Sequence, residues 1–267
     1  GEIRGYPKAV VNGTPVATQA DVKSRWDDGS VKHAIIAFLI SPLAAGSTKT
    51  VTFVDQTTGN NAGFQTPQAM LQDYGFDAEI ILKGPNGISQ TASAKAMLAA
   101  GNFTYWLKGP ICTSIILADH TESHEYDMGF DSHESFRPIF HATFWPKLKK
   151  VKIRYIGENS NCTKLQDITY GLTLTKGTAK TQVYPASPLT HFTASRWTKV
   201  GWIGAEPHAI QTNHNLAYLK ETLFFPNYDT SITISSIAID KRRAGWRAAD
   251  KGLYGAGEWL QDMEDVG

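Results

Sequence analysis

Most of the chain consists of short runs in which apolar and polar residues alternate, the period of a strand with one buried face. The run from Phe136 to Trp145 shows this pattern most clearly. Its even-numbered positions are all apolar, whereas Arg137, His141 and Trp145 share the odd-numbered face. We therefore expect a strand that turns its phenylalanines into a core and leaves the other face toward solvent or a cleft.

The same period predicts strands along most of the sequence and only short helices. Residues 20–25 and 31–40 are expected to form an antiparallel hairpin around the turn signal Asp27-Asp28-Gly29-Ser30. Helices are predicted at 92–100, stopped by Gly101, and at about 215–224, capped by Asn213 or Asn215. The other expected strands are 48–54, 78–83, 102–107, 110–118, 136–145, 149–156, 165–175, 181–184 and 231–239. The predicted fold class is all-β and mainly antiparallel.

Composition changes suggest where the chain divides. Residues 55–77 are polar and rich in turn formers, so we place one boundary there. The predicted domains are a β domain at 1–62, a second β domain at 63–240 and an extension or linker at 241–267. The chain opens on Gly-Glu-Ile-Arg without an initiator methionine, so we expect a processed protein or a fragment of a longer one.

Charge and motifs exclude several classes of protein. The 26 basic and 25 acidic residues nearly cancel, whereas a nucleic-acid binder carries a concentrated basic face. No apolar run approaches the roughly 20 residues that a membrane helix requires. The sequence also has no P-loop, no G-x-G-x-x-G and no G-x-S-x-G. We therefore expect no nucleic-acid partner, no membrane span and no nucleotide or serine-hydrolase site.

The two cysteines leave one question open. Cys112 lies in an apolar strand-like run, where a buried free thiol is common. It would pair with Cys162 only in an oxidising compartment and with suitable geometry. Both alternatives stand at this point.

The segment Trp26-Asp27-Asp28-Gly29-Ser30, with Ala34 after it, resembles the W-x-D-G-S-x-x-x-A signature of exo-rhamnogalacturonan-lyase-like proteins of bacteria and phages. Trp106-Leu107-Lys108-Gly109-Pro110 is similar to a W-x-x-G-P motif in the second domain of that family. The resemblance implies a small RIFT-like barrel, possibly incomplete here, followed by a β-sandwich. It also implies a role near polysaccharides, and its motifs place no active site.

Residues 119–133 hold the densest set of metal-ligand side chains, among them His120, His124 and His133. Imidazole and carboxylate groups together suit zinc or a harder divalent ion. Their spacing matches no standard metal site, so a solvated polar loop, a metal-binding loop and a catalytic loop all remain open. No cofactor is expected other than such a divalent metal.

Two further sets of residues concern sugar chemistry. A polysaccharide lyase needs a cation to neutralise a uronate carboxylate and a base for the C5 proton, and Arg137, His141 and Tyr155 are the candidates for catalysis. Trp106, Trp145 and Arg154 are the candidates for substrate binding, because flat aromatic rings pack against sugar faces. Either set also fits ordinary core and surface positions of a β-sheet.

Three functions therefore remain in view, and whether the protein is an enzyme is open. The first is a carbohydrate-associated β-module, the supporting or binding part of a polysaccharide-acting or cell-surface-recognising protein. The second is a polysaccharide lyase for a uronate-containing polymer. The third is a structural subunit of a phage tail, virion or extracellular filament, assembled with copies of itself or with other subunits. The expected partner is a polysaccharide or cell-surface glycan, and the expected location is extracellular or virion-associated.

Overall fold

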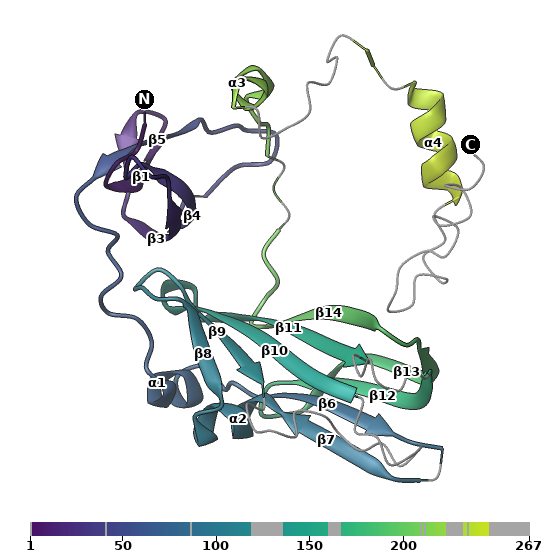
Figure 1. Ribbon diagram of the computed structural model, residues 1–267. Helices are drawn as coiled ribbons and strands as arrows, with labels where there is room; N and C mark the ends of the chain where they lie inside the picture. Colours follow the sequence, from purple (N-terminus) through teal and green to yellow (C-terminus); the bar gives the residue numbers. More distant parts are fainter. Residues whose placement is uncertain are drawn as a thin grey trace. The chain divides into compact units, whose positions relative to one another are not determined.

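The computed structural model describes residues 2–40, 42–85, 87–118, 136–159, 167–208, 210, 212–222, 232–233 and 235–245. The chain divides into two compact units, Gly1–Ala205 and Glu206–Gly267. The predicted all-β, mainly antiparallel class is confirmed, because each strand pairing among the described residues is antiparallel (Figure 1). The predicted boundaries at residues 62 and 240 stay predictions.

Unit Gly1–Ala205 begins with two small sheets. One has the strand order β2-β1-β5, and the other is the hairpin β3-β4, which confirms the predicted pairing around Gly29. Closure of these strands into a RIFT-like barrel stays a prediction. The strands are β1 (Tyr6–Val11), β2 (Thr14–Pro15), β3 (Thr18–Arg25), β4 (Val31–Phe38) and β5 (Val51–Gln56).

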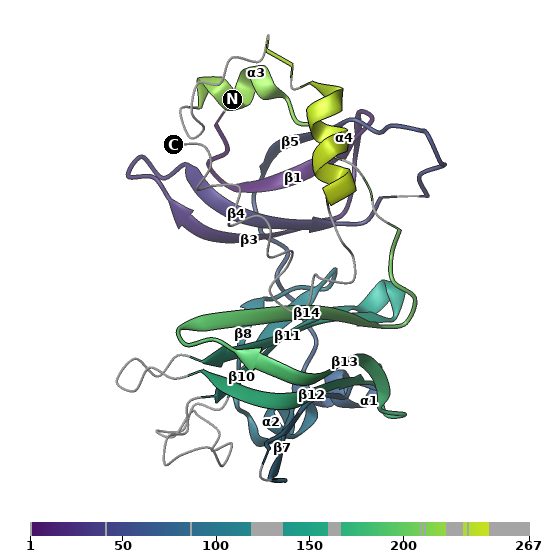
Figure 2. The same cartoon turned by 90° about the vertical axis from the view of Figure 1, so that its right-hand side faces the viewer.

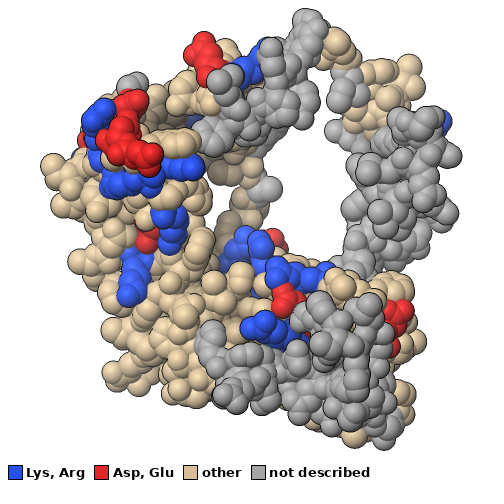
Figure 3. All heavy atoms as spheres, in the orientation of Figure 1, with Lys and Arg blue, Asp and Glu red and all other residues tan. Residues whose placement is uncertain are grey.

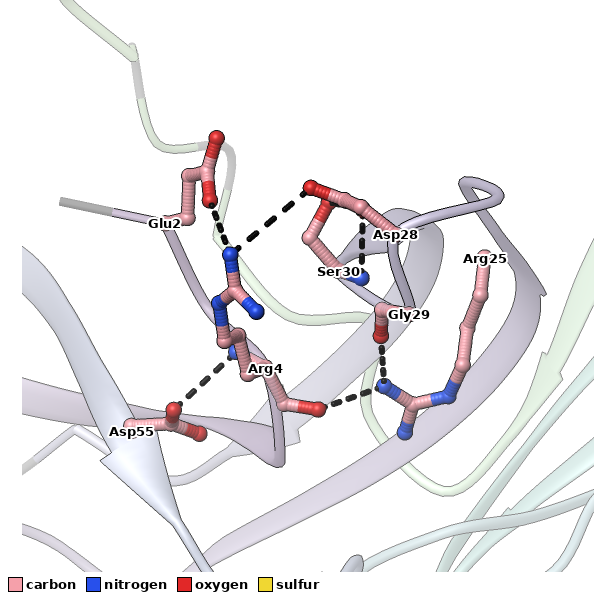
Figure 4. A network of polar contacts seen from close by, with 7 residues as sticks. All are labelled: Glu2, Arg4, Arg25, Asp28, Gly29, Ser30 and Asp55. Atoms are coloured by element: carbon pink, nitrogen blue, oxygen red, sulfur yellow. Dashed lines mark hydrogen bonds and ion pairs between the residues drawn. The ribbon is translucent and has the colours of Figure 1, made fainter.

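A network of polar contacts explains the residues of the β3-β4 turn (Figure 4). Asp28 Oδ1 accepts hydrogen bonds from the Ser30 backbone N–H and hydroxyl at 2.9 and 2.7 Å, which lowers the pKa of that carboxyl. Gly29 has a φ of +83°, a conformation that glycine adopts without strain. The Arg25 guanidinium then donates to the carbonyl oxygens of Gly29 and Arg4 at 3.0 and 2.7 Å. The W-x-D-G-S segment is therefore a turn that ties the hairpin to the start of the chain.

The rest of this unit is a sandwich of two antiparallel sheets, which Figures 1 and 2 show as two layers. One sheet has the order β14-β11-β10-β9-β8 and the other β13-β12-β6-β7. The strands are β6 (Ala78–Lys83), β7 (Ser89–Ser93), β8 (Phe103–Leu107), β9 (Thr113–Ala118), β10 (Phe136–Trp145), β11 (Lys150–Asn159), β12 (Ile168–Lys176), β13 (Thr181–His191) and β14 (Ser195–Ile203).

Side chains from both sheets fill the space between the layers. Phe136, Phe140 and Phe144 of β10 are fully buried, which confirms the predicted alternation of that strand. They meet residues of the other sheet such as Tyr170, whose ring lies edge-on to Phe136 at 5.6 Å. Burying each such ring contributes about 1.5–3 kcal/mol to stability, so this strand is a main source of the fold's stability.

A chain of hydrogen bonds runs through one part of this core. Trp197 Nε1–H donates to the Tyr170 hydroxyl at 2.8 Å, and that hydroxyl lies 2.7 Å from His191 Nδ1. His191 Nε2 lies 3.2 Å from the Ser195 carbonyl oxygen, which can only accept, so the proton of the neutral ring is on Nε2. Tyr170 O–H therefore donates to Nδ1. Burial lowers the pKa of His191 to about 4, so the ring is neutral at pH 7.

The helices are short, as predicted. α2 begins after its cap Ser93 and ends at Gly101, whose φ is +81°, and Asn215 caps α3 as one of the two expected residues. None of the described helices has the length and apolarity that a membrane crossing requires. The helices are α1 (Pro67–Gln72), α2 (Ala94–Ala100), the 3₁₀ turn η1 (Pro146–Leu148), α3 (Leu216–Glu221) and α4 (Ser236–Gly245).

The expected strand at 231–239 is wrong where the structure describes it. Ser236–Gly245 forms α4 instead, within the unit Glu206–Gly267. A strand needs a neighbour for its backbone hydrogen bonds, and the described residues of this unit contain no other strand. A helix satisfies those bonds internally, so alternation alone misled the prediction.

Lys180 neutralises a buried carboxylate at the edge of the second sheet. Its Nζ lies 2.8 Å from Asp77 Oδ2, and the Asp77 side chain is only 8% exposed. We expect Lys180→Met to lower the free energy of unfolding by about 2 kcal/mol, because Asp77 would stay buried without its cation. Urea denaturation measures the loss, with exposed Lys95→Met as the control. Equal midpoints for the two variants would contradict the assigned role.

Candidate functional site

A groove of about 470 Å³ lies within unit Gly1–Ala205, between strands β1 and β3 on one side and β8 on the other. This volume falls in the range of small-ligand sites. We call it the Trp106 groove. Its lining residues are Tyr6, Ala20, Asp21, Val22, Lys23, Arg25, Asn61, Tyr105, Trp106 and Lys108.

The buried Gln19 carboxamide holds the two walls of the groove together. Its Oε1 accepts from the backbone N–H groups of Ile111 and Cys112 at 3.2 and 3.0 Å, and its Nε2 donates to the Cys112 carbonyl oxygen at 2.9 Å. Gln19 thus binds residues 111–112 as a neighbouring strand would. A Cβ on Gly109 would lie 2.2 Å from Gln19 Cδ, so only glycine fits there. The W-x-x-G-P segment has its glycine for this physical reason.

Two more side chains hold the backbone of Lys108, two residues after Trp106. Asp21 Oδ1 accepts from the Lys108 N–H at 3.0 Å, and Asn61 Nδ2 donates to the Lys108 carbonyl oxygen at 2.8 Å. Both backbone groups of Lys108 are therefore held from outside its own strand. The contact orients the end of β8, on which Tyr105 and Trp106 lie.

Trp106 and Lys23 are each the extra residue of a β-bulge. Pairing of β8 with β9 skips from Tyr105 to Leu107, and pairing of β3 with β4 skips from Val22 to Ser24. A bulge turns one side chain out of the strand's alternation and is common beside binding sites. Here the Lys23 ammonium lies 4.2 Å from the centre of the Trp106 ring and donates to the Trp106 carbonyl oxygen.

The groove combines aromatic rings with unneutralised positive charge. Trp106 is 46% exposed. The Lys108 ammonium lies 4.7 Å from the Tyr105 ring centre, and the Arg25 guanidinium lies 5.4 Å from that of Tyr6. Within the described part of the chain, no carboxylate forms an ion pair with the ammonium groups of Lys23 or Lys108. Neither charge is neutralised there, and each ammonium has further N–H groups that can donate to a ligand.

The structure separates the residues predicted for lyase chemistry. Arg137 and His141 lie on the outer face of β10, where His141 is directly opposite Arg154 of β11. Tyr155 points the other way: it is fully buried against Phe140 and donates to the Thr175 carbonyl oxygen at 2.8 Å. Burial raises the pKa of Tyr155, which keeps its hydroxyl protonated, so no phenolate is present to act as a base. Arg137, His141 and Tyr155 therefore do not share one face.

The residues predicted to bind sugar are also dispersed. Trp106 lies in the groove, and Arg154 is exposed on the outer face of the five-stranded sheet. Trp145 packs against a small buried cluster that includes Ala37, Leu107 and Cys112. It therefore joins the hairpin β3-β4 to the sandwich.

The predicted metal ligands His120, His124 and His133 lie outside the described residues. The described residues contain no group of three or more His, Cys, Asp or Glu side chains suited to a metal. Cys112 is a buried free thiol, whose pKa burial raises to about 12, and Cys162 also lies outside the described residues.

Sequence reasoning missed Gln19, Lys23 and Lys108 as parts of the site. Their partners are distant in sequence, since Gln19 and Cys112 are 93 residues apart. The one local signal was Gly109-Pro110, shortly after the aromatic pair Tyr105-Trp106, which marks a constrained turn.

Comparison with protein-family models, with curated proteins and with solved structures finds no match. The functional argument therefore depends on the geometry of the chain itself.

Proposed function

We propose that the protein is a glycan-binding β-module, the binding or supporting part of a polysaccharide-acting or surface-recognising protein, and that the Trp106 groove is its sugar site. The observation that carries this proposal is the exposed Trp106 ring on a bulge, with the ammonium groups of Lys23 and Lys108 nearby. An indole offers an apolar surface to the C–H face of a sugar ring. The ammonium groups donate hydrogen bonds to hydroxyl or carboxylate oxygens.

The rigidity of the site supports the same function. The backbone of the Trp106 wall is held through Gln19, Asp21 and Asn61, so little ordering is needed when a ligand binds. Preorganisation of this kind raises affinity by lowering the entropic cost of association. An aromatic ring that served only the core would be buried, as Trp197 is.

Trp106→Ala is expected to weaken glycan binding about tenfold or more, the loss of roughly 1.4 kcal/mol of stacking and ammonium contacts. The measurement is a titration of the chain with acidic and neutral polysaccharides, followed by tryptophan fluorescence and by calorimetry. Trp26→Ala is the matched control, because Trp26 is 44% exposed and has the Lys32 ammonium 4.2 Å from its ring centre, outside the groove. Equal losses in both variants, or no binding by the unmodified chain, would refute the proposal.

The same samples discriminate the other two functions. A lyase would release an unsaturated product that absorbs in the near ultraviolet, and His141→Ala would abolish that signal. A structural subunit would form a large regular assembly in light scattering. Saturable binding by a chain that yields neither product nor assembly is the result expected here.

A further inference from the structure

The outer face of the five-stranded sheet carries a second set of charged side chains, outside the Trp106 groove. Strand register places Arg154 opposite His141, and Glu158 opposite both Arg137 and Arg196. Figure 3 shows Lys and Arg side chains gathered over this sheet with acidic atoms among them. These two charged rows have one uncharged row between them, and Lys152 lies in the next row beyond Arg154.

The middle row consists of Ile139, Ile156 and Thr198, which are cross-strand neighbours. On β11, Arg154 lies two residues from Ile156. On the other side, Arg137 and Arg196 each lie two residues from their neighbours in the middle row. Each spacing is roughly 6.7 Å along the strand. Arginine side chains from both outer rows are long enough to meet over this row. Ile156 is only 2% exposed, so other atoms already cover its side chain, and a bound group would meet the polar heads of the outer rows instead of the isoleucine.

The charges on this face are not balanced by the residues that the structure describes. Arg196 forms an ion pair with Glu158, whereas Arg154 is exposed and has no carboxylate partner there. The Arg137 Nε is buried and has no hydrogen-bond partner there either. Three guanidinium groups and the Lys152 ammonium in the adjacent row face one carboxylate, so the face carries a net positive charge. His141 adds no charge at pH 7, because burial and the nearby Arg154 and Arg196 lower its pKa.

We propose that this face binds a tetrahedral oxyanion, a phosphate or sulfate ester, between Arg154 on one side and Arg137 and Arg196 on the other. Guanidinium groups form paired hydrogen bonds to such oxygens, and the net positive charge of the face favours an anionic ligand. The exposed guanidinium groups of Arg154 and Arg196 supply the donors, and the buried Arg137 adds positive charge beside them. The site is independent of the Trp106 groove, and it identifies a modified glycan, a phosphorylated or a sulfated one, as a class of ligand.

The test is a titration of the full chain with inorganic phosphate and with sulfate, at constant ionic strength maintained with chloride. The His141 ring, followed by NMR, is the reporter. A bound oxyanion favours the protonated ring, so the pKa of His141 is expected to rise in saturating ligand. By reciprocity the affinity for sulfate, which stays doubly charged over this range, should increase as pH falls toward 6. The charged groups facing His141 are Arg137 on β10, Arg154, Lys152 and Glu158 on β11, and Arg196 on β14.

Arg154→Gln is expected to weaken oxyanion binding about tenfold, and Lys95→Gln on α2 is the control of equal charge change. Binding of phosphate alone or of sulfate alone supports the site and identifies the ester. No rise in the pKa of His141 with either ion overturns the proposal, and this result needs no variant. Equal weakening in both variants, or equal binding of acetate, overturns it as well.

Discussion

Replacing Gly109 with alanine is expected to lower the free energy of unfolding by about 3–5 kcal/mol. The new Cβ would lie 2.2 Å from Gln19 Cδ and 2.3 Å from its Oε1, so the carboxamide must leave its place. Its departure leaves the backbone N–H groups of Ile111 and Cys112 and the Cys112 carbonyl buried without partners. Each unsatisfied group costs about 1–3 kcal/mol. Urea denaturation of the variant measures the total.

Two comparisons identify the cause of that loss. Gly171→Ala is the matched control, because its Cβ would meet its nearest atom, Ser187 Oγ, at 3.4 Å, an ordinary contact; we expect a change of about 1 kcal/mol or less. Gln19→Ala removes both the clash and the hydrogen bonds, so Gly109→Ala should add little to it. Additive losses in the double variant would show that the two residues act independently.

Acidification from pH 7 to pH 4.5 is expected to lower stability by about 2–3 kcal/mol through His191. The pKa of His191 is about 4 in the folded protein, against 6.5 for an unperturbed ring. The unfolded chain therefore takes up the proton first as pH falls. The contribution is complete above pH 6.5, is lost between pH 6.5 and 4, and changes little below that. The structural reason is that Nδ1 must stay unprotonated to accept from Tyr170.

Urea denaturation at a series of pH values, followed by tryptophan fluorescence, measures this dependence. His191→Gln should flatten the curve between pH 6.5 and 4, and exposed His33→Gln should leave it unchanged. His141, whose pKa is also lowered, contributes in the same direction in every variant, so the difference between curves isolates His191. Parallel curves for the wild type and His191→Gln would refute the assignment.

The sequence predicted the elements whose signal is local. The alternation in β10 identified both its bounds and its buried face, because period 2 has a single physical interpretation once the core side is apolar. It also placed Arg137 and His141 outward. The same rule already put Tyr155 on the face opposite Arg154, which the structure confirms.

The parts that could not be predicted depend on contacts between distant residues or on irregular pairing. A β-bulge shifts one residue out of the alternation of apolar and polar positions. The alternation in the sequence therefore could not predict that Lys23 contacts Trp106. The Gln19 contacts with residues 111–112 cross 92 and 93 positions. Residues 231–239 alternate like a strand, but the described part of this unit offers no strand to pair with, and Ser236–Gly245 forms a helix.

The Gln19 carboxamide has a consequence for how this protein can be divided. A recombinant sandwich that started after residue 62 would lose Gln19, Asp21 and Asn61. With them it would lose every side-chain hydrogen bond to the backbone of Lys108, Ile111 and Cys112 described above. The cut would also remove one wall of the Trp106 groove. The β3-β4 hairpin and the sandwich therefore form one structural module. A truncated or chimeric protein should keep both of them.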